Sequence, residues 1–105
     1  MQYRPLGTTD LSVSQQCLGT MTWGTQNKAS DAFDQIDCAL AGGINFIDTA
    51  EMYPVTHMSA ETKGRTEEIL GEWIQKSGQR DKVIVATKVA GKGPKWIHDG
   101  KPING

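Results

Sequence analysis

The chain has 105 residues, of which 37% are hydrophobic, enough for one domain with a hydrophobic core. Its 11 basic and 12 acidic residues are interspersed and leave a formal net charge of -1, so we expect no affinity for nucleic acid or for an anionic membrane. The sequence has neither an apolar run of about 18 residues nor an N-terminal apolar signal core. These features predict a cytoplasmic protein.

The first segments predict short β-strands. "QYRP" and "LSVSQ" flank the turn-rich "LGTTD", a pattern that favours a β-hairpin over residues 2–15. Cys17 and Leu18 then predict a short buried strand, which Gly19 interrupts and which ends near Thr20. A polar loop follows.

A helix is predicted over residues 31–41. Ser30 is a favourable N-cap, and Gly42 and Gly43 suit the helix end. Its apolar residues fall at helical spacing: Phe33, Ile36, Ala39 and Leu40.

"INFID", residues 44–48, predicts the next strand. A second helix is expected to begin with Thr66 as its cap, to carry Glu67 and Glu68 in its first turn, and to close at Gly78. Its apolar stripe consists of Ile69, Leu70, Trp73 and Ile74.

"KVIVATKV", residues 82–89, is nearly continuous in β-branched residues, which is typical of a central parallel strand covered on both faces. The alternation of strands and helices predicts an α/β fold with a parallel sheet. Residues 91–105, rich in glycine and proline, are expected to form a loop.

The two cysteines, Cys17 and Cys38, form no CxxC motif and have no neighbouring histidine, so no metal site is expected. Disulfides are rare in the cytosol, so we expect two reduced, buried thiols.

Polar residues occur where the predicted parallel strands end. Asp48 ends one strand with Tyr53 just beyond it, and Lys88 ends the next. Neighbouring strands lie about 4.8 Å apart, so Asp48 and Lys88 could form an ion pair over which Tyr53 leans. An ammonium group beside a tyrosine favours the phenolate and eases proton donation to a carbonyl. Each residue also has an ordinary alternative: a turn or cap for the aspartate, packing for the tyrosine and solvation for the lysine.

Three segments, "GTMTWG", "NFIDTAEMY" and "VIVATKV", together resemble the aldo-keto reductases, most closely the Tas-like branch, which is similar to the voltage-gated potassium channel β subunits. The resemblance covers essentially the whole chain. It implies that residues 1–105 are the N-terminal part of a single (β/α)8 TIM barrel domain, with a hairpin before three βα strands.

The resemblance also implies NADPH-dependent reduction of aldehydes or ketones. On the matching positions, Asp48, Tyr53 and Lys88 are the catalytic residues, and Asp48 also lies in the cofactor site. Thr20, Met21 and Gln26 match the segment beside the nicotinamide ribose. Trp23 matches an aromatic residue of the substrate pocket, although packing in its loop is the alternative.

The family's catalytic histidine belongs at the end of a fourth strand; His57 and His98 do not match it and are expected in exposed loops. We therefore expect an incomplete chain that is inactive without the remaining barrel. A non-enzymatic NADP-binding auxiliary subunit is the alternative function. A third interpretation, a small independent module with a phosphate loop at Gly91 and Gly93, is disfavoured because no GK[ST] follows.

Overall fold

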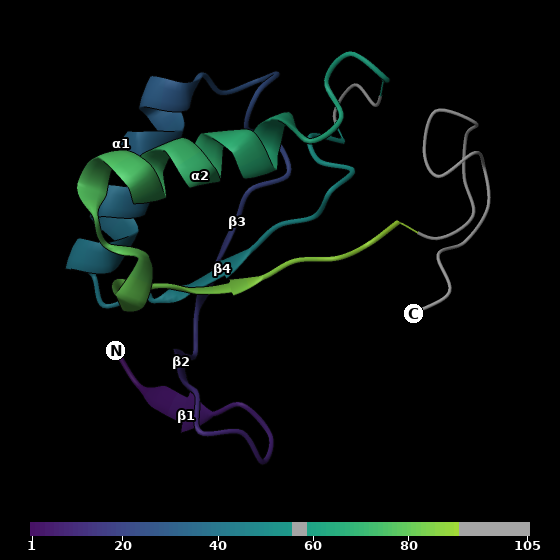
Figure 1. Cartoon of the computed structure of the whole chain (residues 1–105). Helices are drawn as coiled ribbons and strands as arrows, with labels where there is room; N and C mark the ends of the chain where they lie inside the picture. Colours follow the sequence, from purple (N-terminus) through teal and green to yellow (C-terminus); the bar gives the residue numbers. More distant parts are fainter. Residues whose placement is uncertain (56–58, 91–105) are drawn as a thin grey trace.

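The computed structural model describes residues 1–55 and 59–90, and its elements run in the order hairpin, strand, helix, strand, helix, strand (Figure 1). Residues 56–58 and 91–105, which include His57, His98 and the predicted C-terminal loop, lie outside the described residues. The elements are β1 (Tyr3–Pro5), β2 (Ser12–Ser14), β3 (Cys17–Gly19), α1 (Ala29–Ala41), β4 (Phe46–Asp48), α2 (Arg65–Ser77), a 3-10 turn (Arg80–Lys82) and β5 (Ile84–Ala86).

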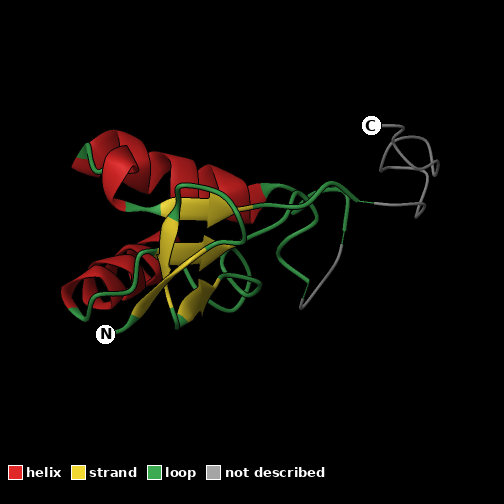
Figure 2. Cartoon of the chain, turned by 90° about the horizontal axis from the view of Figure 1, so that it is seen from below, coloured by secondary structure: helices red, strands yellow, loops and turns green. Residues whose placement is uncertain are grey.

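Three parallel strands form the main sheet in the order β3-β4-β5. Alternate side chains of a strand point to opposite faces. Ile47 of β4, together with its register partners Leu18 and Val85, points toward α1 and α2. The helices lie on one side of the sheet, as Figures 1 and 2 show. The buried core between these layers consists of Trp23, Ala32, Ile36, Ile47, Ile69, Leu70, Trp73 and Val83.

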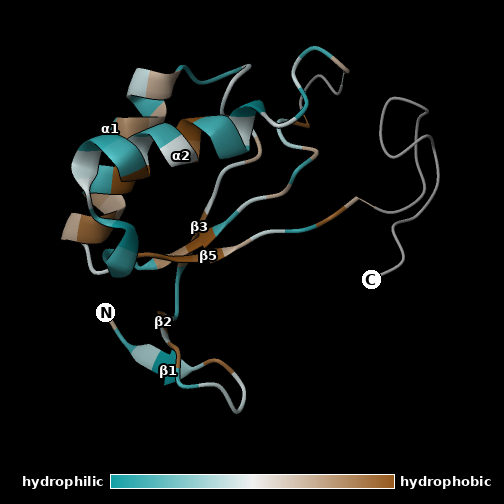
Figure 3. Ribbon diagram, viewed as in Figure 1, coloured by the Kyte–Doolittle hydropathy of each residue, from teal (hydrophilic) through white to brown (hydrophobic). Residues whose placement is uncertain are grey.

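The hydropathy of the main sheet and the helices matches this layering (Figure 3), since the strands of the three-stranded sheet are mainly hydrophobic and the helices alternate between hydrophobic and hydrophilic residues. Both helices place their apolar stripe on the sheet, where it is removed from water. Burial of this stripe is what joins the two βα units.

No described helix covers the opposite face of the sheet. The structure also corrects two predictions, the burial of the two cysteines and the central place of the last strand. Cys17 and Cys38 are free thiols as expected, but both are exposed rather than buried. Cys17 lies on the uncovered face and Cys38 on the solvent side of α1. The strand after Lys82 was expected to be central, yet among the described residues β4 is central and β5 is an edge strand.

The antiparallel hairpin β1–β2 is attached to the N-terminal end of the sheet through Asn45. The Asn45 side chain accepts a hydrogen bond from the Ser14 amide (2.8 Å) and donates one to the Ser12 carbonyl (3.0 Å). The Tyr3 hydroxyl donates to the Gly43 carbonyl at 2.6 Å. An open hollow of about 510 Å³ lies at this junction, at the other end of the sheet from Asp48.

Both predicted N-caps are wrong, whereas the predicted C-terminal ends of both helices are confirmed. The N-cap of α1 is Lys28, whose backbone N–H donates to the Asp31 carboxylate (3.0 Å), so Ser30 lies inside the first turn. α2 begins after Gly64, which adopts a left-handed conformation, and Thr66 is therefore helical. Gly78, also left-handed, ends α2 as predicted.

In the described part of the chain, no helix is both long and apolar enough to cross a membrane.

Candidate functional site

Asp48 and Lys88 form an ion pair at the carboxyl ends of β4 and β5. The Lys88 Nζ atom donates a hydrogen bond to Asp48 Oδ1 at 2.7 Å. The register pairs Asp48 with Ala86, and Lys88 lies two residues further on, so both side chains point to the uncovered face. The Lys88 and Asp48 side chains are 50% and 41% exposed, so a ligand on this face can reach them.

Tyr53 lies against the same lysine. The Lys88 ammonium is 5.1 Å from the centroid of the Tyr53 ring, within the range of a cation–π contact. The Tyr53 backbone is fixed by hydrogen bonds from its own N–H to the Ala50 carbonyl and from the Thr66 N–H to its carbonyl (3.1 and 3.5 Å). The three predicted residues therefore lie together.

The pKa of Lys88 is raised above its ordinary value, because Asp48 accepts a hydrogen bond from the ammonium and Tyr53 adds a second stabilising contact. Desolvation acts in the opposite direction but is outweighed. Lys88 therefore carries its positive charge throughout the neutral and mildly alkaline range.

The predicted cofactor segment after β3 is only partly accessible. Met21 is 51% exposed and Gln26 is exposed, so both can contact a ligand. Thr20 is 1% exposed and donates its hydroxyl hydrogen bond to the Asp48 backbone carbonyl at 2.8 Å. This bond holds the end of β4, and a contact of Thr20 with the cofactor stays a prediction.

Trp23 packs in the core of the described residues, and its place in a substrate pocket stays a prediction. Its side chain is 1% exposed and belongs to the core between α1 and α2. The indole Nε1–H donates to Gln35 Oε1 on α1 at 2.8 Å. This burial is what the alternative interpretation of a packed loop aromatic expects.

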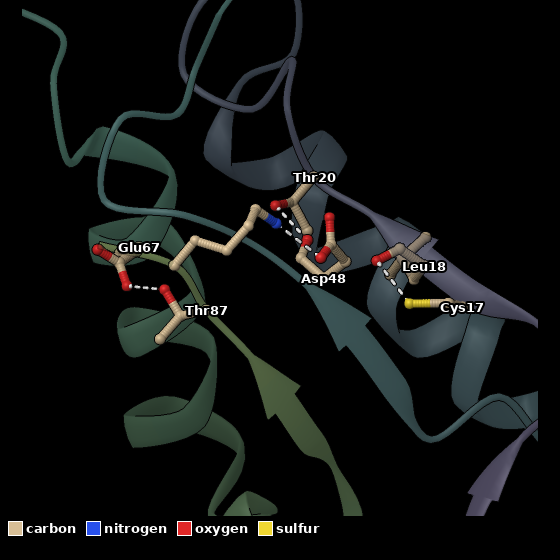
Figure 4. Close-up of polar contacts among 7 residues, drawn as sticks. Cys17, Leu18, Thr20, Asp48, Glu67 and Thr87 are labelled. Atoms are coloured by element: carbon tan, nitrogen blue, oxygen red, sulfur yellow. Dashed lines mark hydrogen bonds and ion pairs between the residues drawn. The ribbon is translucent and has the colours of Figure 1, made fainter. Parts of the chain in front are cut away.

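Sequence analysis missed three residues that hold the Lys88 segment. The Thr87 hydroxyl donates to Glu67 Oε2 on α2 at 2.8 Å, as Figure 4 shows. On the other side, Glu51 donates its N–H to the Lys88 carbonyl and accepts from the Ala90 N–H (3.1 and 2.7 Å). The available signal was position: Glu51 and Thr87 lie at or just beyond predicted strand ends, and Glu67 lies in the first turn of a predicted helix. Neither position distinguishes them from solvated polar residues.

Other chemistry at the strand ends has little support. Among the described residues, no three histidine, cysteine, aspartate or glutamate side chains group as metal ligands do. Desolvation and the nearby Asp48 carboxylate raise the pKa of the Cys17 thiol, which keeps it protonated and a weak nucleophile. The ion pair with its tyrosine is the arrangement on which a reaction could depend.

A parallel sheet with its helices on one face and polar residues at the carboxyl ends of its strands is the arrangement of the β/α barrel proteins. The family model "Aldo/keto reductase family" matches residues 16–104, and the chain belongs to this family. The described fold is therefore the N-terminal portion of a (β/α)8 barrel, as predicted.

Individual relatives agree with this assignment. The chain is 52% identical over 91 residues to "Protein tas" of Escherichia coli, covering 87% of this chain and 26% of that protein. It is 35% identical over 96 residues to "Probable voltage-gated potassium channel subunit beta" of Arabidopsis thaliana, covering 90% and 27%. The solved holo form of aldo-keto reductase AKR11C1 from Bacillus halodurans gives a TM-score of 0.70 at 35% identity, covering 90% and 28%. The chain thus spans about a quarter of the length of these relatives.

Proposed function

We propose that the full-length protein, meaning this chain together with the remaining barrel strands, reduces aldehydes or ketones to alcohols with NADPH. The observation that carries the proposal is the contact of Lys88 with both Asp48 (2.7 Å) and the Tyr53 ring (5.1 Å) on an accessible face. Membership of the aldo/keto reductase family supports it. We further propose a small carbonyl compound as substrate and a cytoplasmic location.

Tyr53 is the proposed proton donor. As a carbonyl carbon accepts a hydride, its oxygen gains negative charge and takes a proton, for which the Tyr53 hydroxyl is the nearest acid of the three residues. The Lys88 ammonium stabilises the phenolate that remains, and Asp48 keeps Lys88 charged and in position. The product is the alcohol, and water restores the proton to Tyr53.

The accessible residues fit the nicotinamide end of the cofactor. The exposed part of the Asp48 carboxylate can accept hydrogen bonds from ribose hydroxyls, and Met21 and Gln26 are exposed on the loop after β3. We propose that these three residues contact the cofactor and that Thr20 orients Asp48 from behind. When bound, NADPH supplies the hydride.

The test is loss of NADPH absorbance at 340 nm with 4-nitrobenzaldehyde, using the full-length protein and its Tyr53→Phe variant. We expect kcat to fall at least about 100-fold, the usual contribution of a positioned general acid. Tyr3→Phe is the matched control, because it removes the same hydroxyl from the hairpin at the other end of the sheet. Unchanged turnover in Tyr53→Phe refutes the assigned role.

A non-enzymatic function is the second candidate, since one relative is named as a potassium channel β subunit. In that case the full-length protein binds NADPH as an auxiliary or regulatory subunit. Cofactor fluorescence separates the two functions: tight NADPH binding without turnover of any carbonyl in a broad panel favours the subunit, and Tyr53-dependent turnover favours the enzyme.

A further inference from the structure

Three consecutive residues in the first turn of α2 together bind the segments that follow β3, β4 and β5. The Arg65 Nη1 atom donates to the Gly24 carbonyl (2.8 Å) and the Thr66 hydroxyl donates to the Trp23 carbonyl (2.6 Å), both in the loop after β3. The Thr66 N–H donates to the Tyr53 carbonyl (3.5 Å) in the loop after β4. Glu67 accepts from Thr87 (2.8 Å) in the segment after β5. We call residues 65–67 the anchor turn.

The contact of the anchor turn with the loop after β3 is close as well as polar. Gly24 has φ +106°, and a Cβ atom placed there would lie 2.7 Å from Arg65 Cδ. Glycine tolerates this positive φ, and any other residue here would be strained and would also require the Arg65 side chain to move. Thr66 is fully buried, so its hydroxyl bond to Trp23 is shielded from water.

Glu67 acts at the residue next to Lys88. Thr87 and Lys88 point to opposite faces of the strand, so a bond that fixes Thr87 on the helix side also fixes the direction in which Lys88 leaves the backbone. Glu51 holds the following peptides from the loop after β4. The Lys88 segment is therefore held from two sides by two carboxylates.

We propose that the anchor turn is a positioning element of the catalytic site and that Glu67, through Thr87, is the positioning residue for Lys88. The proposal rests on the proposed function, because it assigns roles around the same three residues. It adds residues that contact neither substrate nor cofactor and act through the loops they hold.

The test compares Glu67→Ala and Glu67→Gln in the full-length protein, with Glu68→Ala as the matched control from the exposed side of the same turn. Gln keeps an oxygen that can accept the Thr87 hydrogen bond but removes the charge. We expect kcat to fall about 10-fold or more in Glu67→Ala with little change in KM, and to recover largely in Glu67→Gln. A merely structural residue would lower the midpoint of urea unfolding without changing kcat per cofactor-binding site.

A second readout does not require turnover. The pKa of Lys88 is followed by NMR of the lysine Nζ groups, with Lys88→Met used to assign the signal. We expect a lower pKa in Glu67→Ala than in Glu67→Gln and Glu68→Ala, since the displaced lysine loses its contact with Asp48. If all three variants have the same Lys88 pKa and the same kcat, the proposed positioning role of the anchor turn is refuted. Absence of turnover in the unmodified protein overturns the proposed function instead, while the NMR comparison still decides the positioning role.

Discussion

The Asp48–Lys88 ion pair fixes the position of the Lys88 ammonium and contributes little to the stability of the fold. Both side chains are close to half exposed, and ion pairs with this exposure contribute about 0–1 kcal/mol to folding because water and salt screen them. A short contact of 2.7 Å at so accessible a place is therefore better explained by the need for a charged group at a fixed point than by the need for stability.

The pH dependence of this contribution has a definite sign. The folded-state pKa of Lys88 lies above its ordinary value of 10.5, so the contribution is complete below pH 10.5 and is lost as the pH rises through the folded-state pKa. We expect Lys88→Met to reduce the free energy of unfolding by no more than about 1 kcal/mol, equally at pH 7 and pH 9. Urea unfolding of the full-length protein measures this.

Lys82→Met, which removes another exposed lysine charge, is the control for the change in net charge. A difference between Lys88→Met and the unmodified protein that already shrinks between pH 7 and pH 9 would contradict the sign derived from the raised pKa.

The position of the ion pair could be predicted because strand register is regular. Two buried strands with polar residues at their ends suffice to place Asp48 and Lys88 side by side, and the structure confirms the pair. The side-chain orientation of Trp23 and the exposure of Cys17 could not be predicted, because both depend on how a loop folds back and on which sheet face a described helix covers. The catalytic and cofactor roles of the site residues stay predictions.

At the scale of elements, α1 starts at a local contact, whereas the start of α2 is tied to a tertiary contact. The sequence favours Ser30 and Thr66 as caps by propensity alone. In the structure, Asp31 accepts a hydrogen bond from the Lys28 N–H at the start of α1. The Thr66 hydroxyl binds the Trp23 carbonyl in the loop after β3 instead of capping α2. A buried bond to the Trp23 carbonyl outweighs the small gain from capping, which is why local rules miss the helix start by one or two residues.

The Thr66 bond should therefore have a measurable effect on stability. Thr66→Val removes the hydroxyl at nearly constant volume and leaves the Trp23 carbonyl without this donor, so we expect the free energy of unfolding to fall by about 1–3 kcal/mol. Thr66→Ser keeps the hydroxyl and should lose less. Equal losses for Val and Ser in urea unfolding would show that the methyl group, not the hydrogen bond, makes the contribution.

The junction between α1 and the hairpin depends on one glycine. Gly43 has φ +91°, and a Cβ atom there would lie 2.9 Å from Met1 Cβ and 3.0 Å from the Tyr3 hydroxyl. Gly43→Ala is expected to reduce the free energy of unfolding by about 1–2 kcal/mol through backbone strain alone.

Gly71→Ala, at an exposed position of α2 with nothing within 4 Å, should raise the free energy of unfolding by about 1 kcal/mol. Thermal unfolding should show a lower midpoint for Gly43→Ala and a higher midpoint for Gly71→Ala than for the unmodified protein. A lower midpoint for Gly71→Ala would contradict the second prediction.

At the scale of the whole molecule, the described sheet is asymmetric. The face toward the helices contains the core, whereas the face that presents Asp48 and Lys88 has no described helix on it. In the described residues, β3 and β5 each have one strand neighbour, so each leaves an edge of backbone N–H and carbonyl groups. A barrel removes such edges by closing on itself, and the matched stretch of this chain covers only 26% of "Protein tas".

The asymmetry predicts how these 105 residues behave when expressed alone. Because open strand edges pair with other chains, we expect dimers or larger assemblies in size-exclusion chromatography, with the assembled fraction rising as concentration rises. The proposed full-length protein, in which further barrel strands would pair with these edges, should not associate through them and provides the comparison at equal molar concentration. A 105-residue chain that elutes as a monomer and unfolds cooperatively would mean that the α1–α2 layer and the hairpin suffice to stabilise the sheet. The Asp48–Lys88–Tyr53 arrangement could then be titrated without the rest of the barrel.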